Sequence, residues 1–162
     1  MSALDGLYQE VILDHAKRRS GQGLAEPAPG HAVGESHQYN PTCGDEITVR
    51  VELAPGEPGG EPVVARISWA GQGCSISLAA ASVLAESAPG LSRGEALALI
   101  GAFRGQLRSR GTLAPDEEVL GEAAAFAGVS RFPARIKCAM LGWVAAEESL
   151  GQAVWSRVET PV

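Results

Sequence analysis

The chain has 162 residues, of which 45% are hydrophobic and 20% charged, a composition typical of one globular domain. Its 13 basic and 19 acidic residues give a formal net charge of -6, which argues against a protein that binds the phosphate backbone of nucleic acids. No apolar stretch approaches a membrane span, and the first ten residues lack the pattern of a signal peptide, so we expect a cytoplasmic protein.

The first half of the chain predicts one helix followed by three strands. Apolar residues recur at helical spacing over residues 4–19, and Ser2 with Asp5 fits a capping box. A loop rich in Gly and Pro then leads to a polar strand over residues 32–39. Strict alternation over residues 47–53, a turn rich in Pro and Gly, and a returning apolar run over residues 62–69 predict an antiparallel hairpin.

The second half of the chain has the 3.6-residue apolar period of helices. Because strands gather early and helices late, we predict an α+β fold: a small three-stranded antiparallel sheet with helices packed on one face. We expect a single domain over residues 1–162. The predicted helices lie between Gly73 and Pro89, from a capping box of Ser92 and Glu95 through Leu107, for a few residues after Pro115, and from residue 132 or 133 to Leu150.

Three cysteines and one aspartate stand in contexts that could present a metal ligand. Cys43 and Asp45 bracket a glycine in N-P-T-C-G-D. Cys74 follows G-Q-G, where a strand is expected to give way to a helix, and Cys138 lies in the last helix. Three is an odd and low number for a disulfide framework, and cytoplasmic thiols stay reduced. Three soft sulfurs and one carboxylate form a complete tetrahedral ligand set for zinc, so we predict one zinc site.

Each of these residues also has a simpler interpretation. Cys138 could be a small buried hydrophobe, and Asp45 could cap a turn with its own backbone. Arg135, three residues before Cys138, and Lys137 could offset the negative charge of the ligands or form a solvated helix face. The three histidines show no partner pattern and are predicted not to be ligands: His15, His31 and His37.

At the cysteine motifs the sequence resembles the NifU/IscU-type family of iron–sulfur cluster assembly proteins. Two features favour the SufU branch, and with it a SufE/NifU-like fold. Lys137 stands where IscU-type scaffolds have a histidine, and the stretch between Cys74 and Cys138 is longer than in those scaffolds. The resemblance covers nearly the whole chain through L-Y-Q-E-V-I-L-D-H, N-P-T-C-G-D, G-C-S-I-S-L-A-A-A-S and R-I-K-C-A-M-L-G-W.

The resemblance implies a zinc-dependent sulfurtransferase acting in iron–sulfur cluster assembly. Cys43 would accept persulfide sulfur from a SufS-type cysteine desulfurase, a pyridoxal-phosphate enzyme on a separate chain, activate that enzyme, and pass sulfur towards downstream scaffold proteins. We assign Arg135 to partner contact or thiolate support as a hypothesis. The implied zinc ligands are Cys43, Asp45, Cys74 and Cys138.

Two other functions remain open from the residues. The same four side chains could carry a [2Fe–2S] cluster that is assembled and transferred, since thiolates suit iron as well as zinc. Lys137 argues against this scaffold function, because a histidine would supply a spare ligand. The third possibility is a binding module in which zinc is purely structural.

Overall fold

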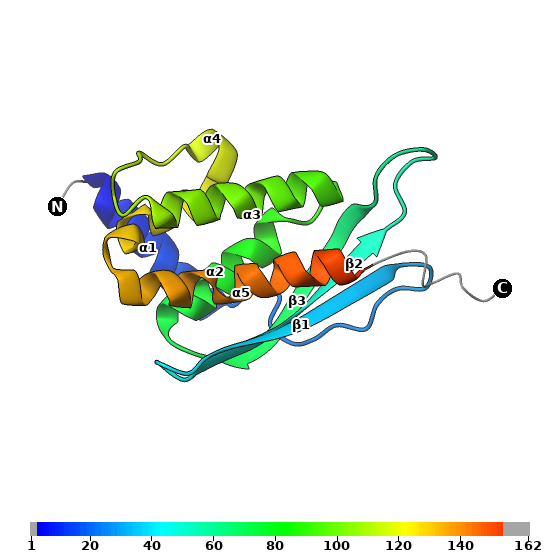
Figure 1. The fold of residues 1–162 in the computed structure, drawn as a ribbon, viewed down its shortest axis with the longest axis horizontal. Coiled ribbons are helices and arrows are strands. Elements are labelled where there is room, and N and C mark those ends of the chain that lie inside the picture. The colour runs from blue at the N-terminus through cyan, green and yellow to red at the C-terminus, as the bar shows by residue number, and fades with distance from the viewer. Residues whose placement is uncertain (1–2, 154–162) are drawn as a thin grey trace.

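The computed structural model describes residues 3–153, which form a three-stranded antiparallel sheet and a layer of helices (Figure 1). The strands are β1 (Ala32–Asn40), β2 (Asp45–Ala54) and β3 (Val63–Gln72), in the order β1-β2-β3. The predicted hairpin is present, and β2 extends beyond the alternating segment at both ends. The predicted α+β architecture is confirmed.

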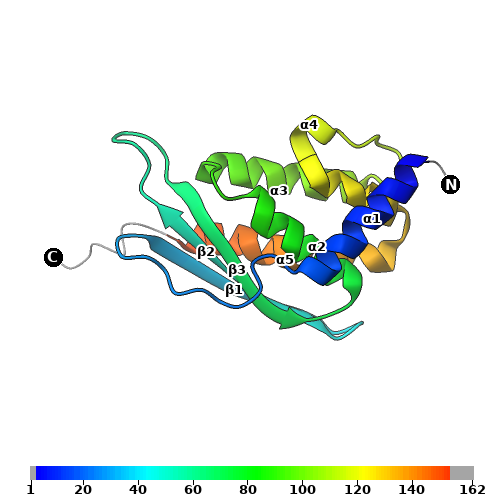
Figure 2. The same ribbon diagram turned by 180° about the vertical axis from the view of Figure 1, so that it is seen from behind.

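The helices cover one face of the sheet, as Figures 1 and 2 show from opposite sides. The capping box of Ser92 and Glu95 is present at the start of the third helix, whereas Ser2 lies outside the described residues. None of the helices within residues 3–153 is long and apolar enough to cross a bilayer. The helices are α1 (Ala3–Arg18), α2 (Ser75–Ser87), α3 (Arg93–Arg108), α4 (Glu117–Leu120), the 3-10 helix η1 (Gly121–Arg131) and α5 (Pro133–Gln152).

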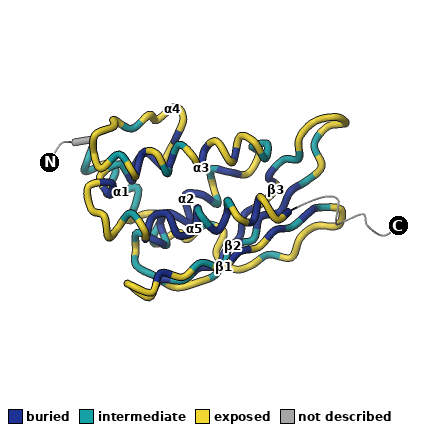
Figure 3. Tube along the Cα trace, in the orientation of Figure 1, coloured by how far each residue is buried: buried dark blue, intermediate teal, exposed yellow. Residues whose placement is uncertain are grey.

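The core lies where α2 and α5 pack on the sheet, and buried residues concentrate there in Figure 3. Trp143 of α5 is fully buried, stacks on Phe103 with 3.9 Å between ring centroids, and donates its indole N–H to the Ala80 carbonyl. Gly34 of β1 lets α5 approach closely, because a Cβ there would stand 1.9 Å from the Ser149 carbonyl oxygen. The position of α5 over the sheet is therefore held by tight backbone packing.

The other face of the sheet is crossed by the connection between α1 and β1 (Figure 2). Glu52 of β2 is buried there, and its carboxylate accepts bonds from the Ala28 amide, the His31 ring and Arg66. Burial works to raise the pKa of Glu52, but these donors outweigh it and hold that pKa below its usual range. This face is thus closed by a polar network rather than by helices.

Candidate metal centre

The turn from β1 into β2 presents Cys43 to solvent and Asp45 to the interior. The Gly44 amide donates to the Asn40 carbonyl at 2.8 Å, and the Thr42 amide donates to the Asn40 side chain at 3.1 Å. Gly44 has a φ of 79°, in the left-handed region that favours glycine. Two potential ligands one residue apart in the sequence, Cys43 and Asp45, therefore differ in burial.

The end of β3 places Cys74 beside Asp45. Gln72 pairs with Glu46, so the chain leaves β3 next to the start of β2 and enters α2 one residue after Cys74. The Cys74 amide donates to Asp45 Oδ1 at 3.2 Å. A Cβ on Gly73 would stand 2.9 Å from Asp45 Cγ, so glycine is required for the carboxylate to lie this close.

Cys138 reaches the same place from the second turn of α5. Its side chain is buried, and its Sγ lies 3.9 Å from Cys43 Sγ. The candidate ligand atoms of Cys43, Asp45 and Cys138 all lie within 4.8 Å of one another. Cys74 is not in that closest group, but its Sγ lies 3.6 Å from Asp45 Oδ2. The fold therefore brings together the four side chains singled out in the sequence.

The spacing of these atoms fits a tetrahedral zinc site. Zinc–sulfur bonds of about 2.3 Å and zinc–oxygen bonds of about 2.0 Å place tetrahedral ligand atoms about 3.8 Å apart for two sulfurs and about 3.5 Å apart for sulfur and oxygen. The corresponding separations are 3.9 Å between Cys43 and Cys138 and 3.6 Å between Cys74 and Asp45. Soft thiolates with one carboxylate also suit zinc chemically.

The pKa values of the two buried candidate ligands, Cys138 and Asp45, are shifted in opposite directions. Burial raises the pKa of the Cys138 thiol, and the neighbouring Cys74 raises it further. Burial also works to raise the pKa of Asp45, but hydrogen bonds from Ser77 and the three thiols outweigh it and hold that pKa below its usual range. In the absence of metal, Asp45 thus carries a charge and Cys138 keeps its proton, which a metal ion must displace.

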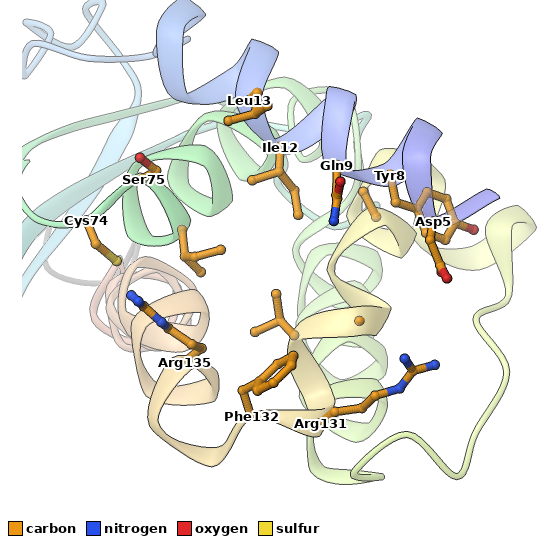
Figure 4. A pocket seen from close by; sticks show the side chains of 14 residues that line it. Asp5, Tyr8, Gln9, Ile12, Leu13, Cys74, Ser75, Arg131, Phe132 and Arg135 are labelled. Carbon is orange, nitrogen blue, oxygen red and sulfur yellow. The ribbon is translucent and has the colours of Figure 1, made fainter. Parts of the chain in front are cut away.

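A mainly apolar groove of about 940 Å³ opens beside Cys74, between α1, the start of α2, η1 and the start of α5 (Figure 4). The Arg135 side chain extends along its wall towards Cys74 in that view. Phe132 is 60% exposed at the rim. Sequence patterns did not indicate this groove, because its lining comes from four elements. The main apolar residues that line it are Ile12, Leu13, Ile76, Val129 and Phe132.

Each histidine pairs with a glutamate instead of lying among these four residues. His31 contacts Glu52 and His37 contacts Glu46. His15 belongs to a second group of potential metal ligands. Its partners, Glu86 and Glu122, come from α2 and η1, so no local pattern around His15 indicated this group.

Comparison with known proteins identifies the family. The chain matches the family described as NifU-like N terminal domain over residues 7–139, and it belongs to that family. It is 37% identical over 93% of its length to the iron–sulfur cluster assembly scaffold protein IscU of Streptococcus pyogenes serotype M1, covering 86% of that protein. It is 36% identical over 92% of its length to the zinc-dependent sulfurtransferase SufU of Bacillus subtilis, covering 92% of that protein.

A solved structure supports the same assignment. The putative iron–sulfur cluster assembly scaffold protein for the SUF system from Fervidobacterium islandicum AW-1 is 31% identical, with a TM-score of 0.68 over 87% of this chain and 94% of that one. The family resemblance inferred from the cysteine motifs is therefore confirmed. The names of the relatives divide between scaffold and sulfurtransferase.

Proposed function

We propose that this chain is a zinc-dependent sulfurtransferase of iron–sulfur cluster assembly that accepts persulfide sulfur on Cys43 from a SufS-type cysteine desulfurase and activates it. The zinc ligands would be Cys43, Asp45, Cys74 and Cys138. Similarity to a relative named as a zinc-dependent sulfurtransferase supports this function. The spacing of the four donor atoms supports the ligand set.

The observation that carries the proposal is the unequal exposure of the three thiols. Cys43 is exposed, Cys74 is half-buried, and Cys138 is only 2% exposed. A sulfur donor on a separate protein can therefore reach Cys43 without opening the core. Cys43 also lies on a turn, whereas Cys138 is held inside a helix, so Cys43 is the sulfur that can move with the smallest structural cost.

The transfer itself is a thiol exchange. The Cys43 thiolate attacks the outer sulfur of the donor persulfide, a new sulfur–sulfur bond forms on Cys43, and the old one breaks. The donor cysteine leaves as a thiolate, so no external oxidant or reductant is needed. Bound zinc would keep the cysteine ligands deprotonated at neutral pH. The rate then depends on the thiolate fraction and the positioning of Cys43.

Arg135 has a supporting role in this proposal. It lies on the groove wall beside Cys74, and within the described part of the chain it makes no ion pair. An unpaired guanidinium attracts anions, and a persulfide is anionic when deprotonated. Arg135 would therefore contact the desulfurase or stabilise sulfur arriving at Cys43. Arg135→Gln should slow sulfur transfer and leave zinc content unchanged.

The test of the function is a desulfurase assay with zinc-loaded protein. Wild type should speed alanine production by a SufS-type cysteine desulfurase, and mass spectrometry should find the added sulfur on Cys43. Cys43→Ser should abolish both effects while circular dichroism shows an intact fold. If Cys43→Ser activates the desulfurase as well as wild type does, Cys43 is not the acceptor.

The scaffold function is the second candidate, favoured by similarity to the relative named as a scaffold protein. The same donors would hold a [2Fe–2S] cluster as cargo. Anaerobic reconstitution with iron and sulfide separates the two functions. A brown protein that transfers its cluster to an apo-ferredoxin supports scaffolding, whereas a colourless zinc protein that activates a desulfurase supports sulfur transfer.

A further inference from the structure

Ser77 touches two of the four proposed ligands. Its hydroxyl donates to Asp45 Oδ2 at 2.5 Å and lies 3.6 Å from Cys74 Sγ. Ser77 is 5% exposed and sits one helical turn after Cys74, on the same face of α2. A buried hydroxyl with this short bond to a carboxylate is well placed to control where that carboxylate points.

The two oxygens of Asp45 are held from the same helix. Oδ2 accepts from the Ser77 hydroxyl, and Oδ1 accepts from the Cys74 amide at 3.2 Å. Each carboxylate oxygen has two lone pairs, so once a metal ion displaces the thiol protons, each oxygen keeps one lone pair for the metal beside these two bonds. The first turn of α2 therefore orients Asp45 before any metal arrives.

Cys43 is held more weakly than Asp45, because its exposed side chain meets its neighbours only through sulfur. Its Sγ approaches Cys138 Sγ at 3.9 Å and donates to the Asp45 carboxylate, but thiols are weak hydrogen-bond donors and acceptors. Cys43 also precedes Gly44, whose backbone is in the left-handed region. Asp45 and Cys43 thus come from the same turn, but the Asp45 side chain is held by stronger hydrogen bonds than that of Cys43.

We propose that Ser77 is a positioning residue that locks Asp45 as the fixed oxygen ligand of the centre. This inference deepens the proposed function and rests on it for the identity of the zinc ligands. Hydrogen-bond partners of metal ligands commonly change metal affinity by about 10–100-fold when removed. Ser77→Ala should therefore weaken zinc binding by about 10–100-fold with the fold intact.

A double-mutant cycle tests whether Ser77 acts through Asp45. Zinc affinity is measured by competition with a chelator for wild type, Ser77→Ala, Asp45→Ala and the double variant. Because Ser77 works by orienting Asp45, Ser77→Ala should add little further loss once Asp45 is alanine. Equal losses in both backgrounds would show that Ser77 acts on something else, and unchanged affinity in the single variant would overturn the proposal outright.

The matched control is Ser75→Ala, an exposed serine in the same helical turn. It should bind zinc as wild type does. The fixed role of Asp45 is also tested in a Cys43→Ala background, where zinc binding is already weakened and Ser77→Ala should weaken it by about a further 10–100-fold. An unchanged zinc affinity on adding Ser77→Ala in that background would contradict the fixed role of Asp45. None of these measurements uses the desulfurase, so failure of sulfur transfer and failure of this inference are separate results.

Discussion

Two groups of potential metal ligands occur in the described residues, and they differ in how far their donor atoms are already satisfied. In each group the candidate ligand atoms lie within 4.8 Å of one another. One is the cysteine centre, formed by Cys43, Asp45 and Cys138 with Cys74 beside them. The other, which we call the histidine cluster, consists of His15, Glu86 and Glu122.

The histidine cluster is a closed hydrogen-bond network. His15 is fully buried; its Nδ1 lies 2.8 Å from Ser82 Oγ and its Nε2 lies 2.9 Å from Glu122. Ser82 Oγ also accepts from the Ser20 amide at 2.9 Å. Both ring nitrogens are thus occupied, and the network ties α1 to α2 and η1.

The cysteine centre has spare donor capacity. Its sulfur contacts of 3.6 and 3.9 Å are long and weak. The thiols therefore lose little hydrogen-bond energy when bonds to a metal ion replace these contacts. Proximity of ligand-type side chains is therefore not enough to define a metal site. Hydrogen bonds within the protein that already satisfy the ligand atoms decide whether a cluster is available to a metal ion.

The largest expected difference between the two groups is in zinc binding. Cys138→Ala should weaken zinc binding by more than about 100-fold, because losing a ligand costs more than losing a hydrogen-bond partner of one. His15→Ala should leave zinc bound. Zinc content after dialysis against a chelator measures both. If His15→Ala lost zinc and Cys138→Ala kept it, the histidine cluster would be the zinc site.

The second difference concerns stability. His15→Ala should lower the free energy of unfolding by about 1–3 kcal/mol, because it removes one of the two hydrogen-bond partners of buried Ser82 and opens a cavity. Urea denaturation of metal-free protein measures this change. Cys43→Ala, at an exposed position, is the matched control and should stay within about 0.5 kcal/mol of wild type. Equal destabilisation by both variants would contradict a structural role for His15.

The third prediction is a pH dependence specific to the cysteine centre. Because the pKa of Cys138 is raised, zinc must displace its proton at neutral pH. Zinc affinity should therefore rise with pH, by about tenfold, or about 1.4 kcal/mol, per pH unit for each proton displaced. Chelator competition between about pH 6 and pH 8 measures the slope. A flat profile, after correction for the chelator's own protonation, would mean that no thiol proton is released.

The smallest expected effect is at the rim of the histidine cluster. Arg18 forms a two-bond ion pair with Glu86, but the two side chains are 42% and 34% exposed. Arg18→Ala should cost less than about 1 kcal/mol, as usual for surface pairs, and the cost should shrink at high salt. Urea denaturation at low and high salt tests this. A larger loss of unfolding free energy that does not depend on salt would show that this ion pair stabilises the fold as much as buried His15 does.

The elements that the sequence predicted correctly are those set by interactions between residues close together in the chain. The alternation over residues 47–53 predicted β2, and Ser92 with Glu95 predicted the start of α3, because side-chain period and capping involve close neighbours. The 3-10 helix η1 was not predicted, since its residues 121–131 are rich in Ala and Gly and carry little periodic signal.

At the cysteine centre, the sequence predicted the candidate ligands but not the residue that holds one of them in place. Motif chemistry singled out three cysteines and Asp45, but Ser77 went unnoticed although it stands three residues after Cys74 on a predicted helix. That spacing was the available signal. The groove beside Cys74 had no such signal, because residues of four elements form it.

The order of residues along this chain was sufficient to specify its elements, its donor atoms and its family, because these depend on short spacings and on side-chain chemistry. The packing of α5 and α2 on the sheet decided which thiol stays exposed, which carboxylate is held, and why His15 is enclosed in its own network. Those properties arise from contacts between segments distant in the chain, where burial and competing hydrogen bonds are set only once the core has formed.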